Sequence, residues 1–225
     1  MKPKFKILNL YACLGGNRAK WDEVAKEANI EIEVTAVELD KELAILYQER
    51  FPNDKVVVAD AHQYLLDHYK EFDFIWSSPP CPSHSRVRIS QKNRESHIPL
   101  FPDLKLYEEI IFLDNYFNGS YLVENVLPYY EPLISAKKRG RHLYWCNFNL
   151  PNNTGERKMF KNMIEVGDIK QLSEFHDYDF TKYKGKQRLN KIARNLVDYE
   201  AGRTIFETVL GIEKQQNEKQ IVFDL

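Results

Sequence analysis

The alternation of short apolar runs with segments of helical period along residues 5–126 most constrains the fold of this chain. The runs expected to be strands are Phe5–Leu10, Ile32–Leu39, Lys55–Ala59, Phe72–Trp76 and Tyr121–Val126. Between them, apolar side chains recur at helical spacing, first at Trp21, Val24, Ala25 and Ala28 and then at Leu43, Leu46 and Tyr47. This alternation is typical of β-α units whose strands pair in parallel, so the sequence predicts an α/β fold.

The remaining segments are less regular. A helix is expected from Leu104 to Phe117 and a further strand from Arg141 to Phe148. The stretch Pro82–Pro102 has no clean period and is expected to be a long loop. Pro151–Lys186 is polar and broken, whereas Leu189–Leu210 is expected to be helical.

Charge and cysteine content narrow the classes of function. The formal net charge of -1 lacks the basic excess of many duplex-binding proteins, so any DNA contact must come from a local cluster. The cysteines Cys13, Cys81 and Cys146 form no pattern typical of a disulfide framework or a zinc site. No apolar run has the length of a membrane span. The chain is therefore expected to be cytoplasmic and to hold no metal.

Ligands of parallel sheets bind beyond the carboxyl ends of the strands, and several such ends carry suitable residues. After the first expected strand, a run of small residues ends in Gly15 and Gly16 and allows a sharp turn for a cofactor, although a plain tight connection explains it equally well. Glu38 and Asp60 end the next two strands. A carboxylate there could bind ribose hydroxyls or an amino group, although it is more often a helix cap.

Cys81 lies in the segment Ser77–Ser85 at the end of the fourth expected strand, with prolines on both sides. The prolines restrict the backbone and thereby fix the direction of the thiol. A cysteine held opposite a planar base could attack carbon 6 of cytosine and make carbon 5 nucleophilic. The alternative is a buried, inert cysteine, which is the common state of this residue.

Acidic and basic side chains follow Cys81 at suitable distances in the chain. Glu124, in the sequence Glu-Asn-Val at a strand end, could act as an acid on ring nitrogen 3 of the same base. Arg139 and Arg141 alternate on an expected extended segment and would point the same way, toward the carbonyl oxygen of the base. For Arg139, a solvated basic edge that contacts only phosphates is an equal alternative.

Together these segments resemble the cytosine carbon-5 DNA methyltransferases. The family turn DLFAGxGG corresponds to NLYACLGG, the family segment PPCQxxS to PPCPSHS, and the family segment QxRxR to KKRGR. ENV is intact, Phe101–Leu104 resembles the helix start after the catalytic loop, and Arg194–Val197 resembles the family's Gly-Asn-Ser-Val. The combination of PPC with a correctly spaced ENV is the specific part of the resemblance.

The resemblance implies a DNA (cytosine-5-)-methyltransferase with a Rossmann-like S-adenosylmethionine-dependent sheet and helices on both faces. Cys81 would be the nucleophile and Glu124 the acid on ring nitrogen 3, while Arg141 and Arg139 would contact the base. The residues implied in cofactor binding are Tyr11, Ala12, Gly15, Gly16, Glu38, Asp60, Pro79 and Asn195. The residues expected to bind a cytosine swung out of the duplex and its phosphates are Ser83, Ser85, Arg86 and Arg88.

Departures from the family pattern affect the predicted domains. Cys13 replaces a glycine, Pro82 replaces a glutamine, and no glutamine stands two residues before Arg139. We expect residues 1–150 to form the catalytic domain, 151–186 a short target-recognition segment, 187–210 a C-terminal helix returning to that domain, and 211–225 a mobile tail. Such a short segment suggests a brief target sequence, weak specificity or help from a partner, and the compact size resembles phage enzymes of restriction-modification type.

Other functions remain open from the sequence alone. Ser78-Pro79-Pro80 half fits the amino methyltransferases, in which an aromatic residue stands at the position of Cys81. The same fold could act on RNA, or be a catalytically silent DNA-binding relative. Double-stranded DNA is the expected partner, and the tail Gln220–Leu225 resembles peptides that bind bacterial sliding clamps, although it could instead pack on the body of the protein.

Overall fold

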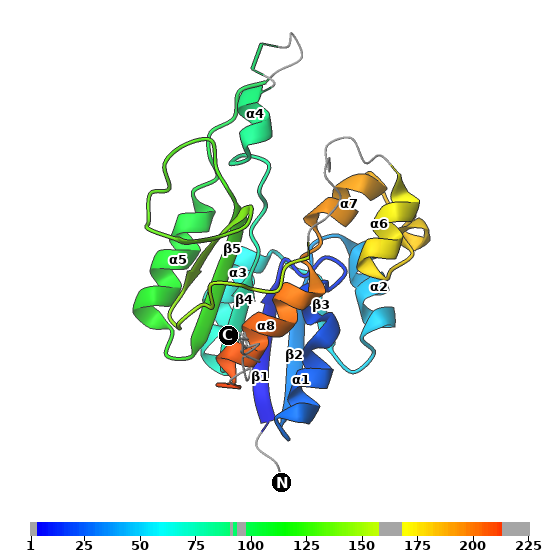
Figure 1. The fold of residues 1–225 in the computed structure, drawn as a ribbon, viewed down its shortest axis with the longest axis vertical. Helices are drawn as coiled ribbons and strands as arrows, with labels where there is room; N and C mark the ends of the chain where they lie inside the picture. Colours follow the sequence, from blue (N-terminus) through cyan, green and yellow to red (C-terminus); the bar gives the residue numbers. More distant parts are fainter. Residues whose placement is uncertain (1–3, 91, 94–97, 158–167, 213–225) are drawn as a thin grey trace, which may run out of the picture.

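A seven-stranded sheet forms the centre of the protein. The computed structural model describes residues 4–90, 92–93, 98–157 and 168–212. Within them the strand order is β3-β2-β1-β4-β5-β7-β6 (Figure 1). The strands are β1 Lys4–Leu10, β2 Glu31–Val37, β3 Lys55–Val57, β4 Phe74–Ser77, β5 Ser120–Val126, β6 Lys137–Arg139 and β7 His142–Cys146.

Six strands run in the same direction, and only β7 is reversed. β1 pairs in parallel with β2 on one side and with β4 on the other, so the order of the strands turns back between β1 and β4. β7 pairs antiparallel with both β5 and β6. Because the connections that leave β1 and β4 diverge, a crevice forms beyond their carboxyl ends.

Helices cover both faces of the sheet, as predicted. On one face α3 and α5 pack against Leu8 and Leu10, and on the other α1 and α8 pack against Ile7 and Trp76. The alternation of Ile7 and Leu8 between the two cores follows from the period of two in a strand. The α-helices are α1 Trp21–Glu27, α2 Lys41–Arg50, α3 Ala61–His68, α4 Arg86–Ser90, α5 Lys105–Tyr116, α6 Ile169–His176, α7 Leu189–Asn195 and α8 Tyr199–Val209. Short 3-10 helices are η1 Asn17–Lys20, η2 Tyr69–Glu71 and η3 Phe180–Lys182.

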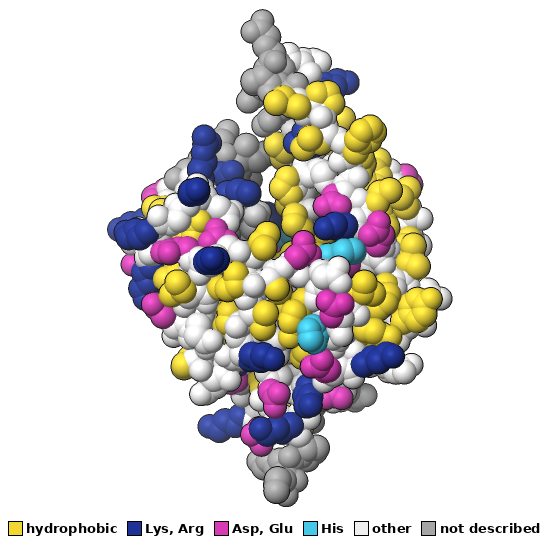
Figure 2. Space-filling model, turned by 180° about the vertical axis from the view of Figure 1, so that it is seen from behind, with side chains coloured by type: hydrophobic (Ala, Val, Ile, Leu, Met, Phe, Trp, Pro, Cys, Tyr) yellow, Lys and Arg dark blue, Asp and Glu magenta, His cyan; other side chains and the backbone are white. Residues whose placement is uncertain are grey.

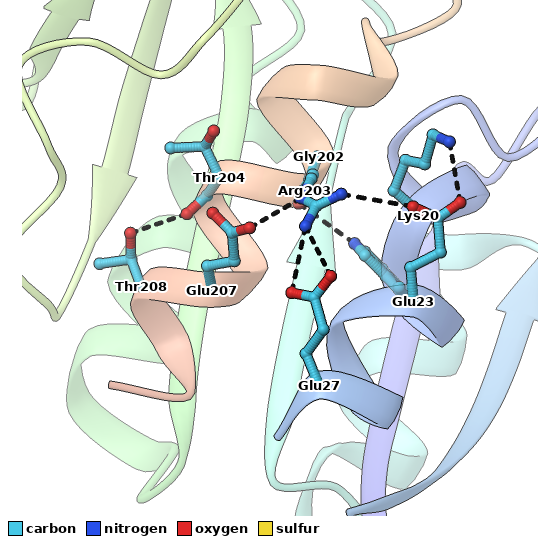
Figure 3. Close-up of polar contacts among 9 residues, drawn as sticks. Lys20, Glu23, Glu27, Gly202, Arg203, Thr204, Glu207 and Thr208 are labelled. Carbon is cyan, nitrogen blue, oxygen red and sulfur yellow. Dashed lines mark hydrogen bonds and ion pairs between the residues drawn. The ribbon is translucent and has the colours of Figure 1, made fainter. Parts of the chain in front are cut away.

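Helix α8 docks on α1 through a charged layer and on η1 through a close backbone contact (Figure 3). The Arg203 guanidinium donates to Glu207 at 2.7 Å and to Glu27 at 2.8 Å. At Gly202, an added Cβ would lie 2.2 Å from the carbonyl oxygen of Asn17. The C-terminal part of the chain is therefore fixed against the segment that follows β1.

The prediction of one helix over Leu189–Leu210 is wrong. α7 ends at Asn195 and α8 begins at Tyr199. Asp198 caps α8 by accepting the backbone N–H of Glu200 at 2.8 Å, and a capping residue has extended rather than helical backbone.

Two stretches contain more structure than the sequence predicts. The expected loop Pro82–Pro102 carries α4 on an arm, defined as residues 82–90, 92–93 and 98–104, that projects from the sheet (Figure 1). The expected strand Arg141–Phe148 is the second strand of a β6–β7 hairpin. Both α4 and β6 are too short for their side chains to show a period in the sequence.

Some predictions fall on residues outside this description. The tail Gln220–Leu225, with the predicted sliding-clamp peptide, lies outside the described residues, as do residues 158–167 of the expected target-recognition segment. Among the helices that are described, none combines the length and apolar character needed to cross a membrane.

Candidate functional site

A cavity of about 640 Å³ lies at the carboxyl edge of the sheet. It is formed by the loops after β1 to β5 and by residues of α7 and the segment that follows it. The predicted site residues that line it are Tyr11, Ala12, Glu38, Asp60, Pro79, Cys81, Glu124, Arg141 and Asn195. The residues expected to bind a cofactor and those expected to act on a base thus share one cavity.

The turn after β1 has a backbone shape that few side chains adopt. Tyr11 and Cys13 have φ angles of 56° and 49°, in the left-handed region that costs a non-glycine residue about 1–2 kcal/mol. Two hydrogen bonds that the turn donates to the end of β2 and to the residue after it hold this shape. Ala12 N–H donates to the Val37 carbonyl at 3.0 Å, and Cys13 N–H donates to Glu38 Oε2 at 2.8 Å.

Gly15 and Gly16 do not line the cavity, although the sequence predicts both as cofactor-binding residues. An added Cβ at Gly15 would lie 2.5 Å from the ring of Phe51, and one at Gly16 would lie 2.2 Å from the carbonyl oxygen of Val197. Both positions therefore need glycine because other segments pack closely against the turn and leave no space for a side chain.

The two predicted acids hold the cavity loops in place. Glu38 accepts the N–H groups of Cys13 and Asp40, and burial raises the pKa of Glu38 against the effect of these hydrogen bonds. Asp60 caps α3 by accepting the N–H of Gln63 at 3.1 Å, which lowers the pKa of Asp60. The helix-cap alternative is thus correct for Asp60, which also lines the cavity.

Glu109 of α5 is a buried carboxylate that connects the turn after β1, the end of β4 and the start of α3. It accepts hydrogen bonds from Tyr11 Oη and Ser77 Oγ, each at 2.6 Å, and lies 3.1 Å from His62 Nδ1. This contact raises the pKa of His62. Glu109 was not predicted, because a single acid within a helix gives no signal of its partners.

The backbone around Cys81 is fixed from two sides. The Cys81 carbonyl accepts the N–H groups of His84 and Ser85, both at 3.0 Å, which makes a tight turn after the prolines. Asn125, next to Glu124 in the chain, donates from Nδ2 to the Pro79 carbonyl at 3.0 Å. The ends of β4 and β5 are therefore connected directly at the site.

Burial raises the pKa of the Cys81 thiol, and the charge of Glu124 adds to this effect. The charges of Lys191 and Arg141 act in the opposite direction. The thiol is therefore mostly protonated at neutral pH. Lys191 was not predicted, although its place one helical turn before Asn195 on α7 could have indicated that both residues face the cavity.

His142 lies between Glu124 and a second acid. Its Nε2 is 3.5 Å from Glu124 Oε1, and its Nδ1 is 3.3 Å from Glu156 Oε1. Arg141 Nε is 3.6 Å from the same oxygen of Glu156. Neither His142 nor Glu156 was predicted to have a role in the site.

The prediction that Arg139 and Arg141 project from one extended segment is wrong. Gly140 has a φ angle of 53° and forms the turn between β6 and β7, so the two arginines flank a hairpin turn. Arg139 donates to the carbonyls of Leu150 and Pro151, at 3.1 Å and 2.6 Å, and does not line the cavity.

The predicted substrate-binding residues lie on the arm, outside the cavity lining. They are Ser83, Ser85, Arg86 and Arg88. Ser83 Oγ accepts the N–H of Asp103 at 3.1 Å, and Arg86 Nε donates to the Pro128 carbonyl at 3.2 Å. Ser85 forms an isolated bridge with Pro128, and Arg88 donates to the Ile98 carbonyl. Each residue therefore has a partner within the protein.

A basic segment, residues 182–191, borders the cavity on the α7 side. Its exposed cations are Lys182, Lys184, Lys186, Arg188 and Lys191, and the segment contains no acid. Figure 2 shows Lys and Arg side chains gathered on one upper flank of the molecule. In the part of the chain that the structure describes, no group of His, Cys, Asp and Glu residues could hold a metal ion.

Comparison with known proteins identifies a family model that matches residues 5–126, more than half of the 225 residues, and is described as C-5 cytosine-specific DNA methylase. No curated protein matches the sequence significantly. The Entamoeba histolytica methyltransferase EhMeth is 10% identical with a TM-score of 0.54, over 95% of this chain and 100% of that chain, a likeness of fold. A Spodoptera frugiperda DNMT2 mutant is 26% identical with a TM-score of 0.36, over 54% of this chain and only 35% of that chain.

Proposed function

Because this chain belongs to the C-5 cytosine-specific DNA methylase family, we propose that it transfers a methyl group from S-adenosylmethionine to carbon 5 of a cytosine in DNA. The observation that supports this function is that Cys81 and Glu124 line the same cavity as Glu38 and Asp60. A nucleophile and an acid for the base thus lie beside acids suited to a nucleoside cofactor.

The cavity residues fit S-adenosylmethionine. The cavity volume of about 640 Å³ is in the range of small-molecule sites. A carboxylate has about four acceptor sites, and the N–H groups of Cys13 and Asp40 use one site on each Glu38 oxygen, so Glu38 retains capacity for ribose hydroxyls. Tyr11, Asp60 and Asn195 would complete the site from the turn after β1, the start of α3 and the end of α7. When bound, the cofactor supplies an electrophilic methyl group.

The chain's own residues would activate the base. The Cys81 thiol would release its proton to water, and the thiolate sulfur would form a bond to carbon 6 of cytosine while ring nitrogen 3 takes a proton from Glu124 and carbon 5 gains the character of an enamine. After carbon 5 has gained the methyl group, water would take the carbon 5 proton, the bond to sulfur would break with its electron pair returning to sulfur, and ring nitrogen 3 would return its proton to Glu124, which restores the ring and the thiolate. Because the Cys81 thiol is mostly protonated, the nearby cations Lys191 and Arg141 would assist by favouring the thiolate.

Double-stranded DNA is the proposed substrate, and its target cytosine must leave the stack to reach Cys81. The basic segment 182–191 would bind phosphates next to the cavity, since phosphate contacts position a protein on DNA without reading its sequence. Arg86 and Arg88 on the arm would do the same from the other side. Ser83 and Ser85 would close over the base only after the arm moves and their present contacts with Asp103 and Pro128 break.

The proposed setting is a compact modification enzyme of the restriction-modification type, acting in the cytoplasm on a brief target sequence. Expression in a bacterial host followed by bisulfite sequencing of the host DNA would reveal that sequence. Scattered cytosine methylation without a shared sequence would point instead to an enzyme of low specificity.

The function is tested by incubating the protein with duplex DNA of mixed sequence and radiolabelled S-adenosylmethionine, beside the Cys81→Ala variant. We expect label in DNA with the wild type and none with the variant, although both bind the cofactor. Duplex DNA containing 5-fluorocytosine should also trap a covalent complex with the wild type alone. Label in RNA but not in DNA, or label in DNA that persists in Cys81→Ala, would contradict the proposal.

A further inference from the structure

The neighbouring strands β5 and β7 place His142 close to Glu124, the acid of the proposed reaction. In the antiparallel pair of β5 and β7, Val126 stands opposite His142 and Glu124 opposite Tyr144. Glu124 and His142 are thus diagonal neighbours on one face of the sheet. The side chains are largely shielded, with 10% of Glu124 and 13% of His142 exposed, and 3.5 Å separates Glu124 Oε1 from His142 Nε2.

The other nitrogen of His142 has an acid of its own. Nδ1 lies 3.3 Å from Glu156 Oε1, and the Glu156 side chain is 19% exposed. Burial tends to raise the pKa of Glu156, but contact with His142 and the charge of Arg141 outweigh burial and lower it. Glu156 is therefore a carboxylate at neutral pH.

The segment that carries Glu156 is fixed on both sides of this residue. Before it, Gly155 has a φ angle of 73°, and an added Cβ would lie 2.9 Å from Thr204 Oγ1 of α8. After it, Arg157 donates to Asp198 Oδ2 at 2.9 Å and to Tyr199 Oη at 2.8 Å. The position of Glu156 therefore depends on the start of α8.

The hairpin turn leaves space for the Glu156 carboxylate. An added Cβ at Gly140 would lie 3.0 Å from Glu156 Oε2, so the acid packs directly against the turn between β6 and β7. The φ angle of 53° at Gly140 also favours glycine. A side chain at position 140 would require the Glu156 carboxylate to shift by a few tenths of an ångström.

We propose that His142, held by Glu156, is a positioning residue for Glu124. Both contacts are at ion-pair distance, and an imidazole attracts two carboxylates through charge only when it carries both protons. In that form His142 stabilises the Glu124 carboxylate that remains once its proton has passed to ring nitrogen 3, and the same proton returns to Glu124 when the bond to Cys81 breaks. This role deepens the proposed function and depends on it.

The test uses the full chain and duplex DNA labelled with tritium at carbon 5 of cytosine, without the methyl donor. Attack by Cys81 makes carbon 5 basic, so the release of tritium to water measures activation of the ring alone. We expect His142→Leu to lower this exchange and kcat by about 10–100-fold, below the ~10²–10⁴ that a positioned acid–base group itself contributes, because Glu124 is still present. The affinity for S-adenosylmethionine and the melting temperature should change little.

His142→Gln should recover most of the exchange, because its amide can donate to Glu124 from a similar place. The rate of tritium exchange in Glu156→Gln should lie between the rates in His142→Gln and His142→Leu. The matched control is His68→Leu, which breaks the exposed contact of 2.7 Å between His68 and Glu71 far from the cavity lining and should have no effect.

The outcomes separate this inference from the function on which it rests. If His142→Leu exchanges tritium at the wild-type rate, His142 does not position Glu124. Equal loss in His142→Leu and His142→Gln, together with loss of cofactor binding, would mean a structural role and would also overturn the inference. If the wild type neither exchanges tritium nor methylates DNA, the proposed function itself fails.

Discussion

Asn125 Nδ2 donates a 3.0 Å hydrogen bond to the carbonyl oxygen of Pro79, and this bond joins the two segments that carry Glu124 and Cys81. Asn125 is buried, and its Oδ1 also accepts the backbone N–H of Val126 at 2.9 Å. A short side chain at position 125 thus fixes the spacing between the proposed nucleophile and the proposed acid.

Asn125→Ala should therefore lower both stability and activity. The variant leaves the Pro79 carbonyl without its partner, and an unsatisfied buried acceptor costs about 1–3 kcal/mol. Chemical denaturation would measure the change in the free energy of unfolding, and methyl transfer would measure kcat. Asn149→Ala, at an exposed asparagine, is the control. Unchanged kcat in a folded Asn125→Ala protein would show that the spacing does not depend on this bond.

The reactivity of the Cys81 thiol should depend on Glu124. Burial and the charge of Glu124 raise the pKa of Cys81, so at pH 8 the thiolate fraction is smaller than in a free cysteine. Glu124→Gln removes the second cause, lowers the pKa, and should speed alkylation by iodoacetamide by roughly 2–10-fold, since one pKa unit is a factor of ten. Mass spectrometry of the peptide containing Cys81 would follow the rate.

The same measurement on Cys13 is an internal control. Burial, followed by the charge of Glu38, raises the pKa of Cys13 to about 12, and Glu124 is not among the main causes. The rate at Cys13 should therefore stay the same in Glu124→Gln. Equal rates at Cys81 in the two proteins would argue against an electrostatic influence of Glu124.

The strand ends were the predictable part of this site. Cys81, Glu124, Glu38 and Asp60 each follow an apolar run, and parallel strands bring their carboxyl ends to one edge, so order along the chain was enough to bring them together. All four residues lie within residues 5–126, the range that the family model matches.

Contacts between distant segments were not predictable from the sequence. Gly16 was expected to touch a cofactor, but its neighbour is the carbonyl of Val197, which comes close only after the chain has folded back. The role of Glu156 depends on the hairpin turn at Gly140, and β6 is too short to give a pattern. Arg139 was misplaced for the same reason, because the turn separates it from Arg141.

Gly16→Ala should weaken cofactor binding through steric overlap alone. Gly16 has helical backbone angles, φ -57° and ψ -47°, so alanine is compatible with the conformation. The added methyl group, however, would lie 2.2 Å from the Val197 carbonyl and 2.7 Å from Leu196 Cγ. Overpacking of this kind costs about 1–3 kcal/mol.

We expect the segment after α7 to move away from the turn in this variant and to carry Asn195 with it. The affinity for S-adenosylmethionine, measured by calorimetry, should therefore fall together with the free energy of unfolding. A Gly16→Ala protein with wild-type stability and wild-type affinity would mean that the contact between the turn and the C-terminal segment can adjust freely.

Charge reversal in the basic segment 182–191 should weaken DNA binding without affecting the cofactor. Lys186→Glu combined with Arg188→Glu removes two exposed cations beside the cavity. The slope of log affinity against log salt should become shallower by about 1 for each phosphate that the variant no longer binds. The matched control reverses Lys26 and Lys70, which are exposed on α1 and η2 and do not line the cavity. This control makes the same change in net charge. If both double variants bind DNA equally weakly, the effect is a nonspecific one of total charge. If only Lys186→Glu with Arg188→Glu weakens DNA binding, phosphates bind at the basic segment 182–191.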